Sequence, residues 1–433
     1  MYRIEDYAKE INRCIQCNFC LEHCPVFIED GVESSVARGR LNLIQALLIE
    51  TTLAPSDRAG ELLNRCLLCT NCTQGCPSGI PVDDIVITAR AELQKRYGLG
   101  RGKRFLLRQV VNRSGTTNLA TWALSMARRL NMVPDEFPEV ASRSFEQRIP
   151  VNVKPEGEVR GKVGYFIGCA TNYLYPEIGD AVLEVLTANG YEVVIPENQH
   201  CCGIPALAHG ELGAAQEAVR WNTDLFAKLD VDVVITDCTS CGYMLKVKSA
   251  KTLAKDDPYQ SKVATVAEKV VEITEFVTRE GLWRDLKLVL GNSQDMDRMD
   301  RAEVDDTAGT NDTTDMVDAT ERELKVTYHV PCHRAWSPNL IQAPRKLISM
   351  LPAVSMVEMS APQRCCGAGG SFFVDHEELA KSIRGRKLED IHDTEADAVI
   401  TQCPACRYYL SQGLKGTMPV LHPVELLAKA IRL

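Results

Sequence analysis

Cysteine is the residue type that most constrains this chain of 433 residues, which contains 18 of them. The cysteines form four groups with none left over, whereas thiols that only fill an apolar core would be scattered. Two groups near the N-terminus hold four cysteines each. The other two hold five each, around an adjacent pair followed by glycine: Cys201 and Cys202 in QHCCG, and Cys365 and Cys366 in RCCG. Such a pair can be buried apolar thiols, a vicinal disulfide, or two ligands of one metal centre.

Bulk composition favours metal ligation over disulfides. The net charge of −9 excludes a generally basic surface for nucleic acid, and no apolar run approaches the roughly 18 residues of a membrane helix. The charged start, MYRIEDYAKEINRC, lacks the apolar core of a signal peptide. We therefore expect a cytoplasmic protein, with any membrane attachment peripheral and through a partner. A reducing cytoplasm disfavours disulfides, so we interpret the thiols as metal or cluster ligands.

The first two groups, CIQCNFCLEHCP and CLLCTNCTQGCP, both read C-x2-C-x2-C-x3-C-P. This run is typical of bacterial ferredoxins with two [4Fe–4S] cubes, in which the fourth cysteine ligates the other cube. Zinc knuckles are the alternative, but they usually present pairs of C-x2-C. The spacing therefore predicts one cube on Cys14, Cys17, Cys20 and Cys76, and a second cube on Cys66, Cys69, Cys72 and Cys24.

The two runs are too far apart for a minimal ferredoxin. The segment between them, SSVARGRLNLIQALLIE, has apolar residues at a helical period. We therefore expect a helical ferredoxin domain over residues 1–100.

The two five-cysteine groups indicate an internal duplication. Their corresponding cysteines are separated by 163 residues (169 to 332), 164 (201 to 365) and 165 (238 to 403), and a nearly constant offset marks a repeat. The first group is Cys169, Cys201, Cys202, Cys238 and Cys241; the second is Cys332, Cys365, Cys366, Cys403 and Cys406.

Each repeat alternates short apolar strands with amphipathic helices, which predicts a parallel α/β unit. KVGYFIGC and VDVVITDC read as strands that end on Cys169 and Cys238, and KVTYHVPC and ADAVITQC repeat them before Cys332 and Cys403. Ligands gather at the carboxyl ends of parallel strands, so five thiols per repeat are expected to converge. The predicted fold is an α+β multidomain chain: the ferredoxin domain, then two duplicated α/β cysteine-rich (CCG) domains at 161–285 and 325–433.

Two connecting segments have opposite charge. Residues 101–160 read as a helical connector, and eleven lysines and arginines lie between 95 and 148. These basic residues are either the solvated face of the connector or a docking face for a partner or an anionic membrane. Residues 286–324 are acidic and short of large apolar residues, so they read as a linker.

The combined pattern resembles a superfamily of iron–sulfur subunits. It includes those of glycolate oxidase, lactate utilisation and anaerobic glycerol-3-phosphate dehydrogenase, together with the catalytic subunit of heterodisulfide reductase. ARGRLNLIQ, at 37–45, also resembles the segment that these subunits carry between the ferredoxin runs. The resemblance implies one or two further clusters in the CCG domains, each a noncubane [4Fe–4S] cluster held by a complete five-cysteine group.

The resemblance also implies two functions. In one, the chain carries electrons from a partner, an FAD-dependent glycolate or D-lactate dehydrogenase or an electron-transfer flavoprotein, to a quinone-reactive subunit or other carrier. The chain itself has no sequence signature for flavin or nicotinamide binding, which favours this role. In the other, the paired CCG sites cleave a disulfide. His200 and His333, each beside a predicted ligand, then either donate protons or hydrogen-bond to sulfur.

Overall fold

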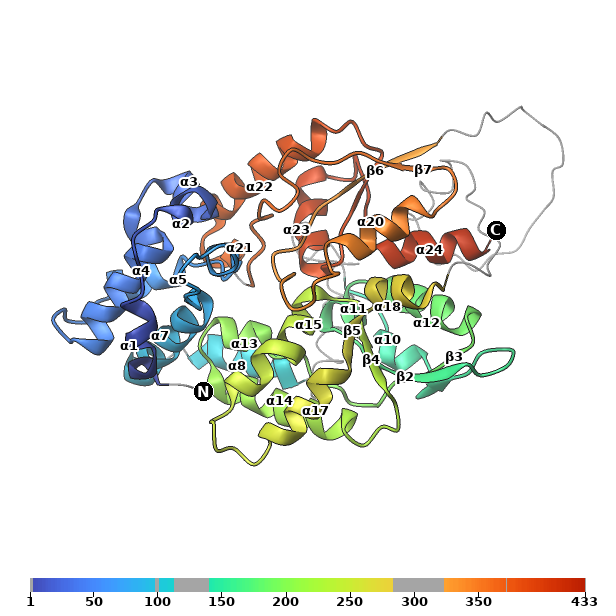
Figure 1. The fold of residues 1–433 in the computed structure, drawn as a ribbon, viewed down its shortest axis with the longest axis horizontal. Coiled ribbons are helices and arrows are strands. Elements are labelled where there is room, and N and C mark those ends of the chain that lie inside the picture. The colour runs from blue at the N-terminus through green and yellow to red at the C-terminus, as the bar shows by residue number, and fades with distance from the viewer. Residues whose placement is uncertain (1–2, 98–100, 113–139, 283–322, 371, 433) are drawn as a thin grey trace.

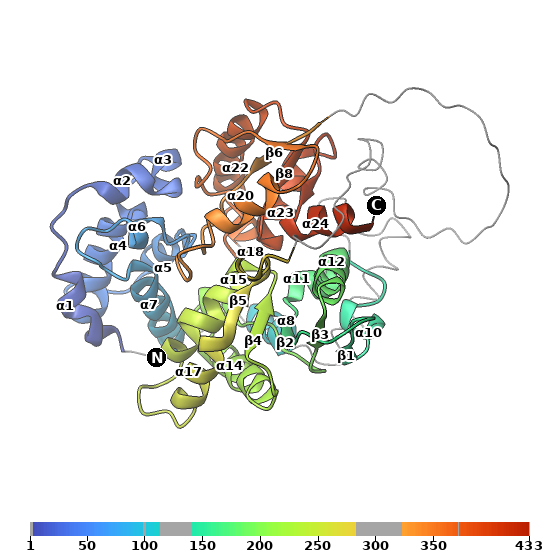
Figure 2. The ribbon, with the colours of Figure 1, turned by 45° about the vertical axis from the view of Figure 1, so that its right-hand side comes forward.

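The computed structural model describes residues 3–97, 101–112, 140–282, 323–370 and 372–432. These residues form a helical N-terminal body and two α/β bodies, which run from blue through green and yellow to red in Figure 1. The turned view in Figure 2 keeps the same arrangement, with the helical body against both α/β bodies. The predicted α+β class is confirmed.

The regular elements described in the N-terminal body are all helices, joined by loops that carry the cysteine runs. The helix expected between the two ferredoxin runs is α4, continued by a π-helical turn, and its buried residues include Leu41, Ile44, Leu47 and Leu48. The elements are η1 (Ile4–Tyr7), α1 (Ala8–Ile11), α2 (Phe19–His23), α3 (Pro25–Asp30), η2 (Glu33–Ser35), α4 (Ala37–Ile44), η3 (Gln45–Ile49), α5 (Asp57–Asn64), α6 (Asn71–Gln74) and α7 (Val82–Tyr97).

Each α/β body is built on one sheet. The first has the strand order β1-β3-β2-β4-β5, all parallel except β1. The second has the order β7-β6-β8-β9 and is parallel throughout. The strands are β1 (Asn152–Val153), β2 (Gly161–Phe166), β3 (Tyr191–Val194), β4 (Val233–Thr236), β5 (Val270–Glu272), β6 (Leu324–Tyr328), β7 (Val354–Met356), β8 (Ala398–Ile400) and β9 (Val420–Leu421).

The predicted duplication is visible in this topology, because β3-β2-β4-β5 and β7-β6-β8-β9 follow the same path. The helices that follow these strands correspond as well. They are α12 (Pro176–Ala188) with α20 (Gln342–Ser349), α14 (Leu212–Phe226) with α22 (Glu377–His392), and α18 (Ile273–Glu280) with α24 (Pro423–Arg432).

The predicted strands end earlier than the sequence suggested. β2 stops at Phe166, and Cys169 is the first residue of α11 (Cys169–Tyr173). Cys238 and Cys403 are the N-caps of α15 (Thr239–Tyr243) and α23 (Pro404–Leu414). The thiols therefore lie in strand-to-helix turns, where the first N–H groups of a helix have no partner within the helix.

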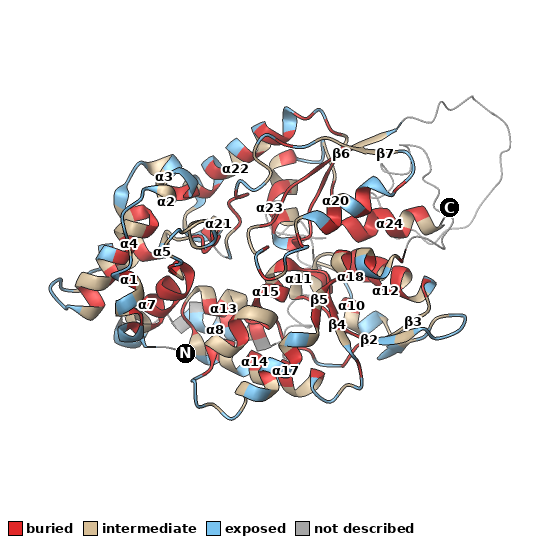
Figure 3. Cartoon of the chain, in the orientation of Figure 1, coloured by how far each residue is buried: buried red, intermediate tan, exposed pale blue. Residues whose placement is uncertain are grey.

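Three hydrophobic clusters hold the bodies together, one for each contact between them. The cluster shared by the two α/β bodies packs α12 against α24 and α18 against α20, so equivalent helices exchange partners about a pseudo-twofold axis. The other two clusters join the N-terminal body to the first and second α/β bodies. In Figure 3 the buried residues lie on the strands and on the helix sides that face inward.

The connecting segments are only partly described. Within the predicted connector at 101–160, α8 (Arg101–Asn112) packs against α13 (Ile204–Ala208) and α14, and β1 extends the first sheet. Residues 113–139 of this connector lie outside the described residues. So does the predicted acidic linker at 286–324, apart from its last two residues, and Leu324 already begins β6. In the described parts of the chain, no helix is both long and apolar enough to cross a membrane.

Candidate metal centres

The two ferredoxin runs fold into matching loops. In each, two residues that are not glycine have left-handed backbone: Gln16 (φ 52°) and Asn18 (φ 67°) in the first run, Leu68 (φ 54°) and Thr70 (φ 60°) in the second. These four occupy equivalent places around the second cysteine of their run. Non-glycine residues rarely adopt this conformation, and strain of this kind concentrates at functional sites.

The loops bring together the two sets of four thiols that the spacing predicted. One small cavity, of about 30 Å³, is lined by Cys14, Cys17, Cys20 and Cys76, and also by Cys72. A second cavity, of about 20 Å³, is lined by Cys24, Cys66, Cys69 and Cys72. The fourth cysteine of each run thus lies with the first three cysteines of the other run.

The second of these cavities contains a buried cation. Arg40 is 2% exposed and lines the cavity, and one of its terminal nitrogens, Nη2, has no hydrogen-bond partner among the described residues. Burial acts to lower the pKa of Arg40, but the Cys66 and Cys24 thiols outweigh it and leave the pKa above its usual value. Burial also raises the pKa of the Cys24 thiol to about 11. A buried guanidinium beside thiols suits an anionic cluster, because a thiolate-ligated metal centre needs a compensating charge.

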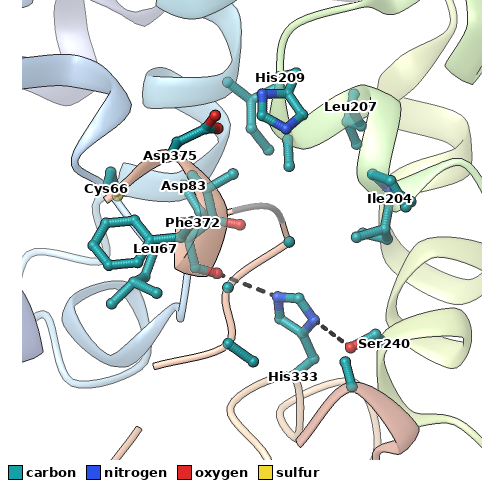
Figure 4. Close-up of a pocket in the computed structure, with 18 of the residues that line it drawn as sticks. Cys66, Leu67, Asp83, Ile204, Leu207, His209, Ser240, His333, Phe372 and Asp375 are labelled. Carbon is teal, nitrogen blue, oxygen red and sulfur yellow. Dashed lines mark hydrogen bonds between the residues drawn. The ribbon is translucent and has the colours of Figure 1, made fainter. Parts of the chain in front are cut away.

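All ten thiols of the two five-cysteine groups line one cavity of about 1100 Å³, together with Cys66 of the N-terminal body. Within each group, thiols far apart in sequence are close. Cys201 Sγ lies 3.6 Å from Cys169 Sγ, and Cys366 Sγ lies 3.4 Å from Cys406 Sγ. Figure 4 shows part of this cavity, with Cys66 on one wall and His333 and Ser240 on another.

The two five-cysteine groups abut each other. The backbone N–H of Thr239 donates to the carbonyl of Gln402, one residue before Cys403 (3.2 Å). The Ser240 hydroxyl lies 3.6 Å from the Cys403 sulfur, and the Cys238 and Cys403 thiols also interact. The C-x2-C turns of the two repeats are therefore packed directly together.

The second group also touches the N-terminal body. The Cys69 and Cys365 thiols interact, and this contact is the largest influence on the pKa of Cys69, which falls to about 7. The carbonyl of Cys332 accepts hydrogen bonds from Thr70 (3.2 Å) and from Gln74 (3.0 Å). The second thiol set of the ferredoxin loops is thus in contact with the second five-cysteine group.

The donor chemistry of all four sites fits iron–sulfur clusters. All 18 cysteines are described, and none of them forms a disulfide, which argues against the vicinal-disulfide alternative. Gly203 (φ 99°) and Gly367 (φ 89°), which follow the double cysteines, both use the left-handed backbone that glycine tolerates best. Closely grouped thiols without a disulfide are ligands typical of soft metals and iron–sulfur clusters.

Comparison with known proteins gives the same assignment. A family model described as a 4Fe-4S dicluster domain matches residues 10–80, and one described as a cysteine-rich domain (CCG) matches residues 163–246 and again 326–411. The chain belongs to the superfamily of CCG-domain iron–sulfur subunits. It accordingly holds several iron–sulfur clusters, with two cubes in the N-terminal domain.

Relatives in the superfamily span nearly the whole chain. One component of the fumarate reductase (CoM/CoB) of Methanothermobacter marburgensis is 27% identical over 98% of this chain and 74% of its own length. The probable glycolate oxidase iron-sulfur subunit of Bacillus subtilis is 25% identical over 97% of this chain and 94% of its own. One component of the dihydromethanophenazine:CoB–CoM heterodisulfide reductase of Methanosarcina acetivorans is 26% identical over 98% of this chain and 95% of its own.

The two histidines singled out from the sequence have different surroundings. His333 lines the large cavity, with Nε2 donating to the Leu68 carbonyl (3.2 Å) and Nδ1 3.0 Å from the Ser240 hydroxyl. It therefore contacts sulfur through Ser240, which reaches Cys403. Burial lowers the pKa of His333. The ring of His200 instead stacks on Trp221, with 4.5 Å between centroids.

Sequence reasoning missed three residues that shape the sites. Arg40 lies in a segment that the sequence singled out, but no pattern gave it a role. Ser240 lies inside a C-x2-C turn and links the two repeats. Arg90, 7% exposed, donates to the carbonyls of Leu63 and Cys66 and, in the first CCG domain, Ala208. Arg40 and Arg90 read as ordinary charged helix residues in the sequence, because their burial is visible only in the structure.

Proposed function

We propose that this chain is the electron-transfer subunit of an oxidoreductase complex, which carries electrons from an FAD-dependent glycolate or D-lactate dehydrogenase, or an electron-transfer flavoprotein, to a quinone or other carrier. One observation carries this proposal: the four thiol sets form an unbroken series of contacts. The series runs from the exposed loop at Cys17, across Cys72, which lines both ferredoxin cavities, through the Cys69–Cys365 contact, to the Cys403–Cys238 contact. Such a series is what one-electron transfer between clusters requires.

The proposal assigns every cysteine as a ligand. One cube is on Cys14, Cys17, Cys20 and Cys76, and the other on Cys66, Cys69, Cys72 and Cys24. The first CCG cluster is on Cys169, Cys201, Cys202, Cys238 and Cys241, and the second is on Cys332, Cys365, Cys366, Cys403 and Cys406. What supports this assignment is the grouping of the thiols in the cavities described above.

The protein's own residues insulate and orient these centres. Bound clusters supply one-electron redox chemistry. Arg40 offsets negative charge at the second cube, and most of the CCG thiols are buried side chains on the wall of the large cavity. Arg90 fixes the backbone of Cys66 against the first CCG domain, so the distance between the two domains is set by hydrogen bonds.

A second candidate function is reduction of a disulfide between the two CCG sites. The observation that favours it is that both five-cysteine groups face one cavity, which extends beyond the thiols to the apolar side chains of Leu207 and Phe372 and to Asp375. His333, held by Ser240 and the Leu68 carbonyl, would be a proton donor that reaches the Cys403 sulfur through the Ser240 hydroxyl.

Anaerobic purification of the chain with its partners tests both functions. Electron transfer predicts co-purification with a flavoprotein, and bleaching of the cluster absorbance when glycolate or D-lactate is added. Thiol release from a heterodisulfide by the chain alone, driven by a reduced dye, would instead establish the reductase function. A preparation with zinc and no acid-labile sulfide would contradict both.

A further inference from the structure

The two CCG sites are built from equivalent elements but differ at one buried position. Three residues before the first cysteine of each group, the first repeat has Phe166 and the second has His329. The 163 residues between them equal the offset from Cys169 to Cys332. Phe166 is the last residue of β2. The backbone N–H of His329 donates to the Ile400 carbonyl (2.9 Å), so His329 occupies the equivalent position just past the end of β6.

His329 is buried without a nitrogen or oxygen partner for its ring. It is 1% exposed, and neither ring nitrogen has a nitrogen or oxygen hydrogen-bond partner among the described residues; the ring interacts instead with the Cys366 thiol. An unsatisfied buried donor costs about 1–3 kcal/mol, so a native structure rarely keeps one without a ligand to complete it.

The groups that face the His329 ring are thiols. One ring nitrogen and the sulfurs of Cys366 and Cys406 all lie within 4.8 Å of one another. The interaction with Cys366 raises the pKa of His329, but burial has the larger effect and lowers it. The ring thus points at two members of the second five-cysteine group.

The equivalent position in the first repeat offers no donor. Phe166 is fully buried and packs against Phe226, with 5.7 Å between ring centroids. It belongs to the same hydrophobic cluster as Cys201, Cys202, Cys238 and Cys241. At this position the first site is therefore bordered by the apolar ring of Phe166, and the second by the imidazole ring of His329.

We propose that an N–H group of His329 donates a hydrogen bond to sulfur at the second CCG site, and that this bond raises the reduction potential of the cluster there above that of the first site. The inference rests on the proposed function, since it requires clusters in both CCG sites. A hydrogen bond to cluster sulfur favours the reduced state, because that state carries more negative charge. Imidazole keeps at least one N–H whether neutral or charged, so the donor does not depend on titration.

The position of the second site explains how a higher reduction potential there would act in electron transfer. This site contacts the second cube, through Cys365 and Cys69, and it also contacts the first CCG site, through Cys403 and Cys238. An electron that leaves the cubes therefore reaches the His329 site first, and the higher potential holds it there until the first site or an acceptor takes it.

Variants at the two equivalent positions test the inference in the full-length protein. His329→Phe installs the residue of the first repeat, His329→Gln keeps a side-chain N–H, and Phe166→Leu is the matched control. Redox titrations followed by electron paramagnetic resonance measure each CCG potential. The signals are assigned with Cys202→Ser and Cys366→Ser. Pulsed measurements on protein with ¹⁵N-labelled histidine detect any histidine nitrogen coupled to the cluster.

The expected result is a downward shift of the second-site potential in His329→Phe, with loss of the nitrogen coupling and a smaller shift in His329→Gln. Phe166→Leu should leave the second site unchanged. Equal shifts in both His329 variants, no shift in either, or loss of iron from the second site would overturn the hydrogen bond. If wild-type protein contains iron and sulfide for two cubes only, the cluster assignment itself fails, which is a separate result.

Discussion

At the scale of single residues, several side chains and backbone angles that tune the centres are not evident from the cysteine pattern. Leu68 has a left-handed backbone although its side chain has no local means of stabilising one, and nothing in the letters CLLC signals this. It follows from wrapping three thiols around one point. Arg40 is similar: it reads as one of many charged helix residues until burial places it beside Cys24 and Cys66.

Replacing Arg40 with methionine should lower the reduction potential of the second cube. The change keeps an unbranched side chain but removes a buried positive charge that favours the reduced, more negative cluster. We expect a shift on the order of 60 mV, which is tenfold in the equilibrium constant of a one-electron couple. A redox titration followed by electron paramagnetic resonance measures it. Arg58→Met, at an exposed arginine paired with Glu61, is the control, and equal potentials in both variants would contradict the charge argument.

Cys202→Ser should remove the spectroscopic signal of the first CCG site and leave both cubes intact. Serine is a poor ligand for iron, and Cys202 is 4% exposed, so solvent cannot replace it. Iron analysis and electron paramagnetic resonance check the result, with Cys366→Ser as the mirror variant at the second site. A Cys202→Ser spectrum identical to that of the wild type would mean that Cys202 is not a ligand.

At the scale of elements, periodicity predicted the repeated strand–helix order well, while the ends of the strands depended on the sites. Apolar runs such as KVGYFIGC and VDVVITDC were expected to continue to the cysteine. The strands stop two or three residues before it, because the cysteine belongs to the start of the next helix. The hydrophobic pattern of a sequence indicates which residues are buried. The residues just after these strands are still buried, although they no longer form hydrogen bonds within the sheet. Sequence could not give that difference.

At the interface between the repeats, equivalent positions are occupied by side chains of different chemical type. Directly before the equivalent helices α18 and α24, the first repeat has Glu272 and the second has His422. Glu272 accepts a hydrogen bond from Gln402 (2.8 Å), and His422 Nε2 donates to the Asp237 carbonyl (2.9 Å). Burial lowers the pKa of His422 to about 3, so its neutral ring gives Glu272 no positive partner.

This interface should weaken as pH rises from 6 to 8. Burial raises the pKa of Glu272 to about 8, against about 4.3 for an unfolded glutamate. The folded state therefore binds a proton that the unfolded state has released, and stability falls between these two pKa values. Across pH 6–8 the loss should be on the order of 2 kcal/mol.

Glu272→Gln, which cannot ionise, should lack this loss. Anaerobic thermal unfolding at pH 6, 7 and 8 compares the two proteins. The wild-type midpoint should fall relative to that of the variant as pH increases. Parallel curves would show that Glu272 is ionised in the folded protein.

At the scale of the whole molecule, the composition of the three bodies was predictable and their contacts were not. Cysteine spacing predicted the grouping of the ferredoxin thiols and the duplication. The contact of Cys69 with Cys365 joins residues nearly 300 positions apart, and it arises from the packing of Leu67 and Val36 against the second CCG domain. No local sequence pattern predicts that packing, because the same apolar residues could pack against any apolar surface of suitable shape.

The exposed end of this series should be where a partner delivers electrons. Cys17 is the one exposed cysteine, and neighbouring Ile15 is 69% exposed. An apolar side chain beside an accessible cluster loop suits a docking contact, and a charge at its centre weakens binding. Ile15→Glu should slow reduction by the co-purified flavoprotein about tenfold, a loss of about 1.4 kcal/mol, and leave reduction by dithionite unchanged.

Stopped-flow spectroscopy of the cluster absorbance measures both rates. Val159→Glu, at another exposed apolar residue just before β2, is the control and should behave as the wild type. If Ile15→Glu is reduced as fast as the control, the partner docks elsewhere.

The single exposed thiol also determines which cluster is lost first when the protein is exposed to oxygen. Oxygen reaches the cluster nearest solvent before the others, so the first cube is the one that a brief exposure should destroy. The other three thiol sets contain no exposed cysteine, so clusters bound there would then survive in a protein that has lost only its connection to its electron donor. Such a preparation would look almost fully loaded by iron content and yet be inactive with its partner.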